Sequence, residues 1–353
     1  MIELFFKLPL SFYVALSTSF LVCFFIIKTK RWHRFISSDS TEGVQKLHQQ
    51  PTPRVGGLGI FVAVVCAYCF ENSDRSLILG PLILAGLTPF IFGFAEDLTK
   101  QVSVSTRLLA TILAGFLGWL FTGTSLSHVG ISLLDPLLKN QIFSVLFTAI
   151  AIGGIANAVN MIDGLNGLAS SMMVIALVTT ATIAHSVGDV SLAIASLTVS
   201  AAIFGFFLLN WPWGKIFLGD GGSYFGGFAL AWSCVLLVER NSSISPFVGL
   251  LVCIYPFTEV VFSIYRRKAR SINTTVPDVH HLHSLVYRRY LSAYKFRVPS
   301  NSIAGLIVGA LSLPPAICAY YFKNSNTFCI IASLFFTISY LAFYSRIVRF
   351  KWL

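Results

Sequence analysis

Two long apolar runs of the chain are separated by the stretch Asn157-Ala-Val-Asn160-Met-Ile-Asp163-Gly-Leu-Asn166-Gly-Leu-Ala-Ser170. The side chains that recur at every third position there are Asn157, Asn160, Asp163 and Asn166. In a straight helix this row would rotate by roughly 60° per step, so the four side chains could not point at one place. Gly164 and Gly167 allow the backbone to bend there. An ionisable group buried in hydrocarbon costs about 2.5–3.5 kcal/mol, so the cluster needs a compensating role. The structural alternative is a polar seam between packed helices, although such seams usually contain fewer polar groups.

The composition around this stretch is that of a membrane protein. Of the 353 residues, 56% are hydrophobic and only 11% are charged, whereas about a quarter of a soluble chain is charged. The mean hydropathy is +0.78. The sequence therefore predicts an all-α, polytopic integral membrane protein with one membrane-embedded domain over residues 1–353. The net charge of +11 does not indicate nucleic-acid binding, because the basic residues lie in loops beside the apolar runs.

The apolar runs predict ten or eleven membrane-spanning helices. The expected spans cover residues 9–27, 56–70, 77–95, 104–122, 141–160, 166–186, 190–209, 221–238, 246–265, 301–321 and 327–344. Several of these runs are short or interrupted by glycine, which is why the number could be ten.

The basic residues predict the orientation of these spans. If the loop after the first span is cytoplasmic, the loops and the tail on that side hold 20 of the 25 Lys and Arg residues. The positive-inside rule then predicts an N-terminus outside the cell membrane and a C-terminus in the cytoplasm.

Five polar motifs would share this cytoplasmic face. They are the loop from Pro51 to Gly57, the pair Glu96-Asp97, the row from Asn160 to Asn166, the segment Phe217-Leu-Gly-Asp220-Gly-Gly-Ser223 and the histidines His280-His281-Leu-His283. A transporter would more often place its polar groups near the membrane midplane. Convergence at one membrane surface instead predicts a site that is open to the cytosol and touches the bilayer.

The residue types in these motifs suit phosphate chemistry with a metal ion. Asp97, Asp163 and Asp220 are expected at helix ends among small residues, and hard oxygen ligands of this kind suit Mg²⁺. Asp220 opens a helix among glycines, where an anion is stabilised. His281 and His283 are expected to donate to a pyrophosphate, because a zinc site would need further ligands. These features together predict phosphoryl transfer from a soluble nucleotide to a lipid.

The same motifs, in this order, resemble glycosyltransferase family 4, the polyprenyl-phosphate N-acetylhexosamine-1-phosphate transferases. The resemblance extends from about Pro51 to Arg289, and the segments Tyr255-Pro-Phe-Thr-Glu259 and Ser263-Ile-Tyr-Arg-Arg267 look closest to the branch that initiates O-antigen synthesis. It implies a Mg²⁺-dependent, multi-pass enzyme of the bacterial inner membrane, with its N-terminus periplasmic. Such an enzyme transfers a sugar 1-phosphate from a UDP-N-acetylhexosamine to undecaprenyl phosphate and releases UMP. A homodimer is left open.

The resemblance also implies roles for individual residues. Asp220 would hold the metal, with Asn160 as a second contact. Asp163 and Asn166 would lie at the nucleotide end of the site, and Asp97 near the lipid phosphate as its activator or as an electrostatic partner of the metal. Asp97 and Asp163 would be the catalytic residues. His281 and His283 would hold the diphosphate. We further expect Asn157, Lys100 and Arg54 to contact substrate, since Lys100 lies one helical turn after Asp97 and would meet the same phosphate.

Three positions depart from the family pattern. Glu96 replaces the first aspartate of the usual pair, Asn166 replaces an aspartate and cannot act as a base, and Glu259 stands where many relatives have aspartate. Three consecutive histidines are typical of the phospho-MurNAc-pentapeptide translocase branch and are not present here. That translocase and a polyprenyl-lipid transporter are the alternative functions. The sequence names neither the sugar nor the glycan pathway.

Overall fold

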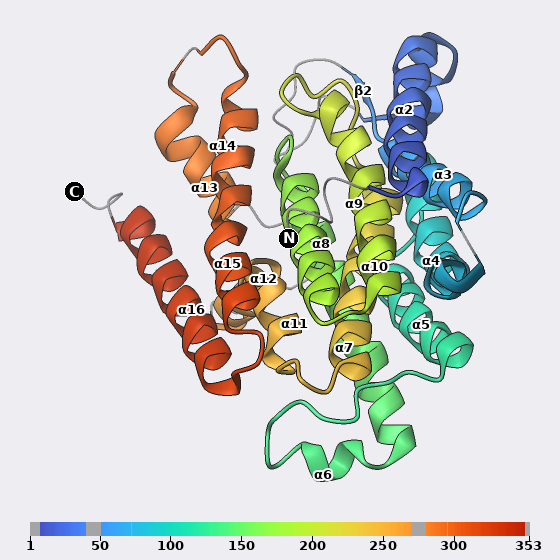
Figure 1. Ribbon diagram of the computed structural model, residues 1–353. Helices are drawn as coiled ribbons and strands as arrows, with labels where there is room; N and C mark the ends of the chain where they lie inside the picture. The colour runs from blue at the N-terminus through green and yellow to red at the C-terminus, as the bar shows by residue number, and fades with distance from the viewer. Residues whose placement is uncertain (1–7, 40–50, 72, 270–279, 295, 350–353) are drawn as a thin grey trace.

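The computed structural model describes residues 8–39, 51–71, 73–269, 280–294 and 296–349, and it is a helical bundle with one two-stranded antiparallel ladder (Figure 1). The elements are α2 (Leu10–Ser37), β1 (Ser38–Asp39), β2 (Thr52–Pro53), α3 (Gly56–Tyr68), α4 (Ser73–Thr99), α5 (Val104–Thr122), α6 (Asp135–Leu138), α7 (Gln141–Ile162), α8 (Leu168–Ser186), α9 (Val190–Asn210), α10 (Gly219–Arg240), α11 (Phe247–Val252), α12 (Ile254–Ala269), α13 (Leu282–Val286), the π-helix η1 (Tyr287–Leu291), α14 (Ser300–Gly309), the 3₁₀-helix η2 (Ala310–Ser312), α15 (Leu313–Tyr321) and α16 (Asn326–Arg349).

The expected all-α membrane fold is confirmed. Within the described ranges, nine helical stretches are long and apolar enough to cross a membrane. The other two expected spans are helical but differ from the prediction. The span expected at 56–70 is the helix Gly56–Tyr68, with only 13 residues. The span expected at 246–265 is divided at Cys253 into the six-residue α11 and the longer α12.

Helix α10 lies at the centre of the bundle, and its whole apolar stretch is buried. Glycines let its neighbours approach closely. A Cβ atom on Gly57 of α3 would lie 2.2 Å from the backbone nitrogen of Gly222, and one on Gly227 would lie 2.8 Å from the Cα atom of Ala156 in α7. Small residues are the usual means by which membrane helices pack tightly. The first turn of α10, which carries Asp220, is therefore fixed by the helices around it.

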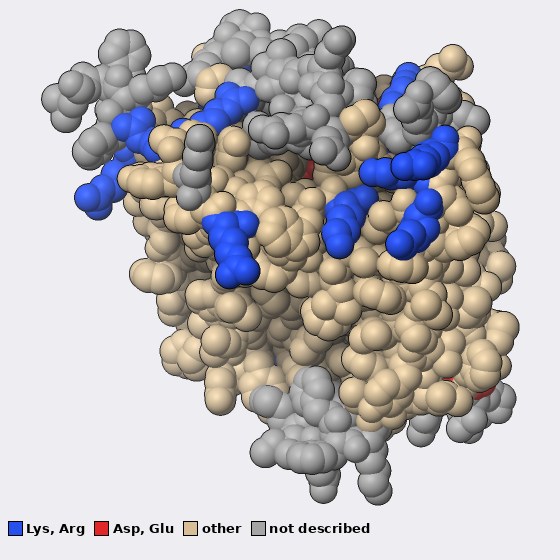
Figure 2. All heavy atoms as spheres, turned by 90° about the horizontal axis from the view of Figure 1, so that it is seen from above, with Lys and Arg blue, Asp and Glu red and all other residues tan. Residues whose placement is uncertain are grey.

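The ends of the helices place the polar motifs on one side of the bundle, as expected. At the end shown uppermost in Figure 1, the first residues of α3 pair with the loop before α10, because the backbone N–H groups of Gly56 and Gly57 donate to the carbonyls of Phe217 and Leu218. At the opposite end, Arg240 forms an ion pair with Asp189, with 2.7 Å between Nε and Oδ2. Figure 2, viewed from above, shows Lys and Arg side chains spread over the face that carries the motifs.

This arrangement leads to a prediction about membrane orientation. A reporter fused after Leu353 should be cytoplasmic, and one inserted between Asp189 and Ser191 should be periplasmic, because counting the expected spans along the sequence assigns 20 of the 25 basic residues to the side of the motifs. Paired phosphatase and fluorescent-protein fusions measure this directly. A periplasmic reporter at Leu353 would contradict the orientation.

Candidate active site

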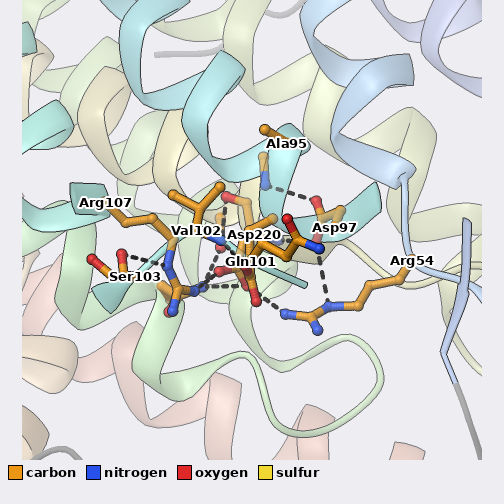
Figure 3. Close-up of polar contacts among 12 residues, drawn as sticks. Arg54, Ala95, Asp97, Gln101, Val102, Ser103, Arg107 and Asp220 are labelled. Carbon is orange, nitrogen blue, oxygen red and sulfur yellow. Dashed lines mark hydrogen bonds and ion pairs between the residues drawn. The ribbon is translucent and has the colours of Figure 1, made fainter. Parts of the chain in front are cut away.

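The site is built around the carboxylate of Asp220, which is 3% exposed. Its Oδ1 atom accepts from Arg54 Nη2 at 2.5 Å and from Asn160 Nδ2 at 3.2 Å. Its Oδ2 atom accepts from Arg107 Nη1. Figure 3 shows the two guanidinium groups approaching Asp220 from different elements. Segments far apart in the sequence therefore meet at one buried carboxylate, as the shared-face argument predicts.

Asp97, at the end of α4, holds the start of α10 in place. Its two carboxylate oxygens accept from the backbone N–H groups of Asp220 (2.8 Å) and Gly221 (2.9 Å). Arg54 Nε also lies 3.3 Å from its Oδ1 atom. The side chain is 1% exposed. A carboxylate at a helix N-terminus satisfies N–H groups that have no partner inside the helix and interacts favourably with the helix dipole. Asp97 is thus in the expected cluster, with its oxygens directed at α10 and Arg54.

Glu96, its neighbour, has a local structural contact. Its Oε2 atom accepts from the backbone N–H of Val102 at 2.8 Å, which closes the turn between α4 and α5. Lys100 lies in this turn with φ of +59° and is exposed. Among the contacts within the described ranges, Asp97 bonds to the start of α10 and to Arg54, whereas Glu96 bonds to Val102, so the structure separates the roles of the acidic pair.

Two of the four side chains in the row at 157–166 lie at the cluster. Asn160 donates through Nδ2 to Asp220 and, at 2.8 Å, to Ser223 Oγ. Asp163, at the end of α7, is partly buried, and its carboxylate has no hydrogen-bond partner within the part of the chain that the structure describes. Desolvation raises the pKa of Asp163 to about 7, while the positive charge of Arg54 acts in the opposite direction.

The other two members of the row point elsewhere. Asn157 donates to Thr111 Oγ1 of α5 at 2.8 Å, and Asn166 donates to Ser302 Oγ of α14 at 3.0 Å. The structure does not bring Asn157 to the cluster. Asn166 instead lines a neighbouring cavity. The bend between α7 and α8, where Gly167 has φ of +79°, does not cancel the rotation of the row.

The histidine loop reaches the same region next to Asp163. A Cβ atom on Gly164 would lie 2.4 Å from His283 Nε2, so the imidazole packs directly against the backbone there. The rings of His281 and His283 are parallel, with 5.5 Å between their centroids. Both histidines are buried.

This contact gives a prediction for Gly164→Ala. The new methyl group would displace the His283 ring, and UMP release should fall by about tenfold to a hundredfold, since a shift of about 1 Å at a reacting group can cost that much. Gly80→Ala in α4 is the matched control, because a Cβ atom there would make only ordinary van der Waals contacts, the nearest at 3.4 Å to the Tyr68 ring. Equal turnover in the two variants would show that His283 does not need this position.

The oxygen donors of the cluster fit a magnesium ion. Asn160 directs its Nδ2 atom at Asp220 and Ser223, which leaves its carboxamide oxygen without a protein partner in the described ranges, and Asp163 and Asp220 supply carboxylates. No group of three or more His, Cys, Asp or Glu side chains in the described residues is arranged as a metal cage. Mg²⁺ does not require one, because it usually binds through one or two carboxylates together with substrate phosphates and water.

Arg107 is the cluster residue that the sequence analysis did not identify. It lies in the first turn of α5 and contacts Asp220, which is 113 positions away in the chain. Its position at the start of an apolar helix is also typical of a lipid-headgroup anchor. The signal that could have identified it is its place on the same membrane face as the five motifs.

Two cavities in the bundle bear on the chemistry of the site. The larger, of about 1120 Å³, is lined by Lys28, Lys30, Asn166, Trp213, Lys215 and Phe217 among others. The second, of about 510 Å³, is almost wholly apolar and lies among α7, α10, α11 and α12, with Ile155, Val235 and Phe257 in its wall. The basic, partly aromatic cavity lies at the end of the bundle that carries the charged cluster, whereas the apolar cavity extends from Ala158 of α7 towards the opposite end, where Leu134, Val238 and Pro246 line it.

Comparison with known proteins gives a consistent result. The sequence model described as "Glycosyl transferase family 4" matches residues 79–238. The chain is 29% identical over 240 residues to the "Probable undecaprenyl-phosphate N-acetylglucosaminyl 1-phosphate transferase" of Bacillus subtilis (strain 168), which covers 68% of this chain and 66% of that protein. It is 28% identical to the "Undecaprenyl-phosphate alpha-N-acetylglucosaminyl 1-phosphate transferase" of Yersinia pestis (69% of this chain, 68% of the relative) and to that of Salmonella typhi (75% and 73%). The matches thus span about two thirds to three quarters of each relative.

Proposed function

Because the chain belongs to glycosyltransferase family 4, the polyprenyl-phosphate N-acetylhexosamine-1-phosphate transferases, we propose that it transfers a sugar 1-phosphate from a UDP-N-acetylhexosamine to undecaprenyl phosphate and releases UMP. The observation that carries this proposal is the buried carboxylate of Asp220 between Arg54 and Arg107 at the end of an apolar bundle. A water-soluble nucleotide and a membrane lipid can react only where cytosol and bilayer meet.

The larger cavity supports the nucleotide half of the proposal. Its volume of about 1120 Å³ is ample for a nucleotide sugar, and the three lysines in its wall suit a diphosphate. Phe217 and Asn166 supply an aromatic surface and an amide that suit a nucleobase. Two residues of the cavity wall are close in the chain to residues of the cluster. Phe217 lies three residues before Asp220, and Thr52 lies two residues before Arg54.

The apolar cavity supports the lipid half. It is bounded by membrane helices on several sides, and its lining is suited to an isoprenoid chain rather than to a sugar. A Cβ atom on Gly154, which lines it, would meet nothing within 4 Å. We infer that part of the polyprenyl chain occupies this space while its phosphate extends to the cluster.

The reaction requires one bond to form and one to break. An oxygen of the lipid phosphate attacks the β-phosphorus of the UDP-sugar, the bond from that phosphorus to the bridging oxygen breaks, and UMP leaves with the bonding electrons. Arg54 and Arg107 would neutralise phosphate charge, and His281 and His283 would donate to the diphosphate. A magnesium ion held by Asp220 and Asn160, next to Asp163, would supply further charge neutralisation when bound. Asp97 would keep α10, and with it Asp220, in position.

The donor and the pathway are narrower proposals. The names of the relatives specify N-acetylglucosamine, and we propose this sugar as the donor, with a cell-envelope polysaccharide such as O-antigen as the destination. The experiment is to incubate membranes containing the protein with undecaprenyl phosphate and each of several UDP-N-acetyl sugars. UMP release that depends on both substrates, and a lipid product whose mass includes a sugar and one added phosphate, are expected. A transporter would release no UMP in any combination.

A further inference from the structure

A buried glutamate lies next to the histidine loop and has no part in the cluster around Asp220. Glu259 of α12 is 0% exposed. A buried charge is costly unless it is paired and hydrogen-bonded, so its partners indicate what it does.

The carboxylate of Glu259 accepts three hydrogen bonds from two parts of the chain. Its Oε1 atom accepts from His281 Nδ1 at 2.9 Å and from the backbone N–H of Leu282 at 3.3 Å. Its Oε2 atom accepts from the Tyr340 hydroxyl of α16 at 2.7 Å. Tyr340 therefore fixes the carboxylate, and the carboxylate fixes the beginning of α13.

One helical turn further along α16, Tyr344 also bonds to the histidine loop and to α12. The hydroxyl of Tyr344 donates to the backbone carbonyl of His280 at 3.1 Å and accepts from Arg266 Nη1 of α12 at 2.9 Å. Helix α16 thus holds the histidine loop directly through Tyr344 and indirectly through Tyr340 and Glu259.

These bonds determine which atom of the His281 ring can act on a ligand. A carboxylate only accepts, so Nδ1 must carry a proton, and any contact of this ring with substrate uses Nε2. The ring also stacks in parallel on His283, which packs against Gly164 beside Asp163. A change in the orientation of His281 would therefore be transmitted to the edge of the site.

We propose that Glu259 and Tyr340 are positioning residues, which hold His281 with Nδ1 inward so that Nε2 faces the diphosphate of the nucleotide. The proposal rests on the proposed function, because it takes a uridine diphosphate as the ligand. On this proposal, α16 contributes to nucleotide binding through Tyr340, although none of the residues described around Asp220 belongs to α16.

The test is a double-mutant cycle on UDP affinity, measured by calorimetry with purified full-length protein and Mg²⁺. Glu259→Gln should weaken UDP binding about tenfold and Tyr340→Phe about threefold, because each removes or loosens a hydrogen bond that orients the ring. In a His281→Ala background, neither change should have any further effect, because both residues act through His281. Tyr321→Phe, at an exposed tyrosine of α15, is the matched control and should bind as the wild type does.

Each result has a distinct meaning. Wild-type affinity in both variants, or an equal loss with and without His281, overturns the positioning role while leaving the transferase function intact. If the wild-type protein does not bind UDP at all, the proposed function and the positioning role both fail. Tyr340→Phe keeps the aromatic ring, so it also answers the question if Glu259→Gln lowers the melting temperature too far for calorimetry.

Discussion

Replacing Asp220 by asparagine is expected to reduce UMP release by about a thousandfold or more, which equals about 4 kcal/mol of transition-state stabilisation. The side chain keeps its shape but loses the charge that would hold a cation and that positions Arg54 and Arg107. The measurement is UMP release by the purified variant over a range of Mg²⁺ concentrations, with the melting temperature recorded alongside.

Asp189→Asn is the matched control for this variant. Asp189 is also a carboxylate paired with an arginine, Arg240, but it lies between α8 and α9 at the far end of the bundle. Its loss should leave turnover within about twofold of the wild type, because its bonds to Arg240 and to the first turn of α9 stabilise the far end of the bundle and do not reach the cluster. Normal turnover of Asp220→Asn at ordinary Mg²⁺ concentrations would show that Asp220 has no role in the active site.

Replacing Asp97 by asparagine should have the next largest effect, a loss of at least about a hundredfold in turnover together with about 2 kcal/mol of stability. Both carboxylate oxygens of Asp97 accept a backbone N–H, but asparagine has only one side-chain oxygen. Its NH₂ group would therefore face the N–H of Asp220 or Gly221, which would lose its acceptor. The first turn of α10 would shift, and Asp220 with it.

The contrast with Glu96→Gln makes this prediction specific. Glutamine can still accept from the Val102 N–H, so this variant should retain activity within about threefold of the wild type. Both variants are assayed for UMP release well below their melting temperatures. If Asp97→Asn turns over like Glu96→Gln, the N-terminus of α10 does not need this carboxylate.

Hydropathy was sufficient to predict most of the fold. Apolar runs such as that from Val190 to Asn210 are long and continuous, and they became single helices. The run at 246–265 did not, because it contains a break at Cys253 that its composition does not reveal. The region at 56–70 forms a short helix whose glycines pack on α10, and hydropathy does not report such packing.

The site was only partly predictable, for a related reason. Asp97, Asn160 and Asp220 stand out as polar groups at the ends of apolar runs, and their shared face follows from counting spans. The contacts of Arg107 and Tyr340 connect residues 113 and 81 positions apart, and each residue alone is typical of a membrane interface. The directions of Asn157 and Asn166 depend on the bend between α7 and α8, which residue spacing does not specify. The proposed substrates rest on the family resemblance rather than on spacing or composition.

The most direct test of the central claim uses UDP-N-acetylglucosamine with a radioactive label on its β-phosphate. Purified protein is incubated with this donor, Mg²⁺ and undecaprenyl phosphate, and the lipid is then extracted and counted. Phosphoryl transfer at the Asp220 cluster predicts that the label moves into the lipid while unlabelled UMP accumulates, and that Asp220→Asn abolishes both. Label that stays in the nucleotide, either as UDP after transfer of the sugar alone or as unreacted donor, would contradict the account.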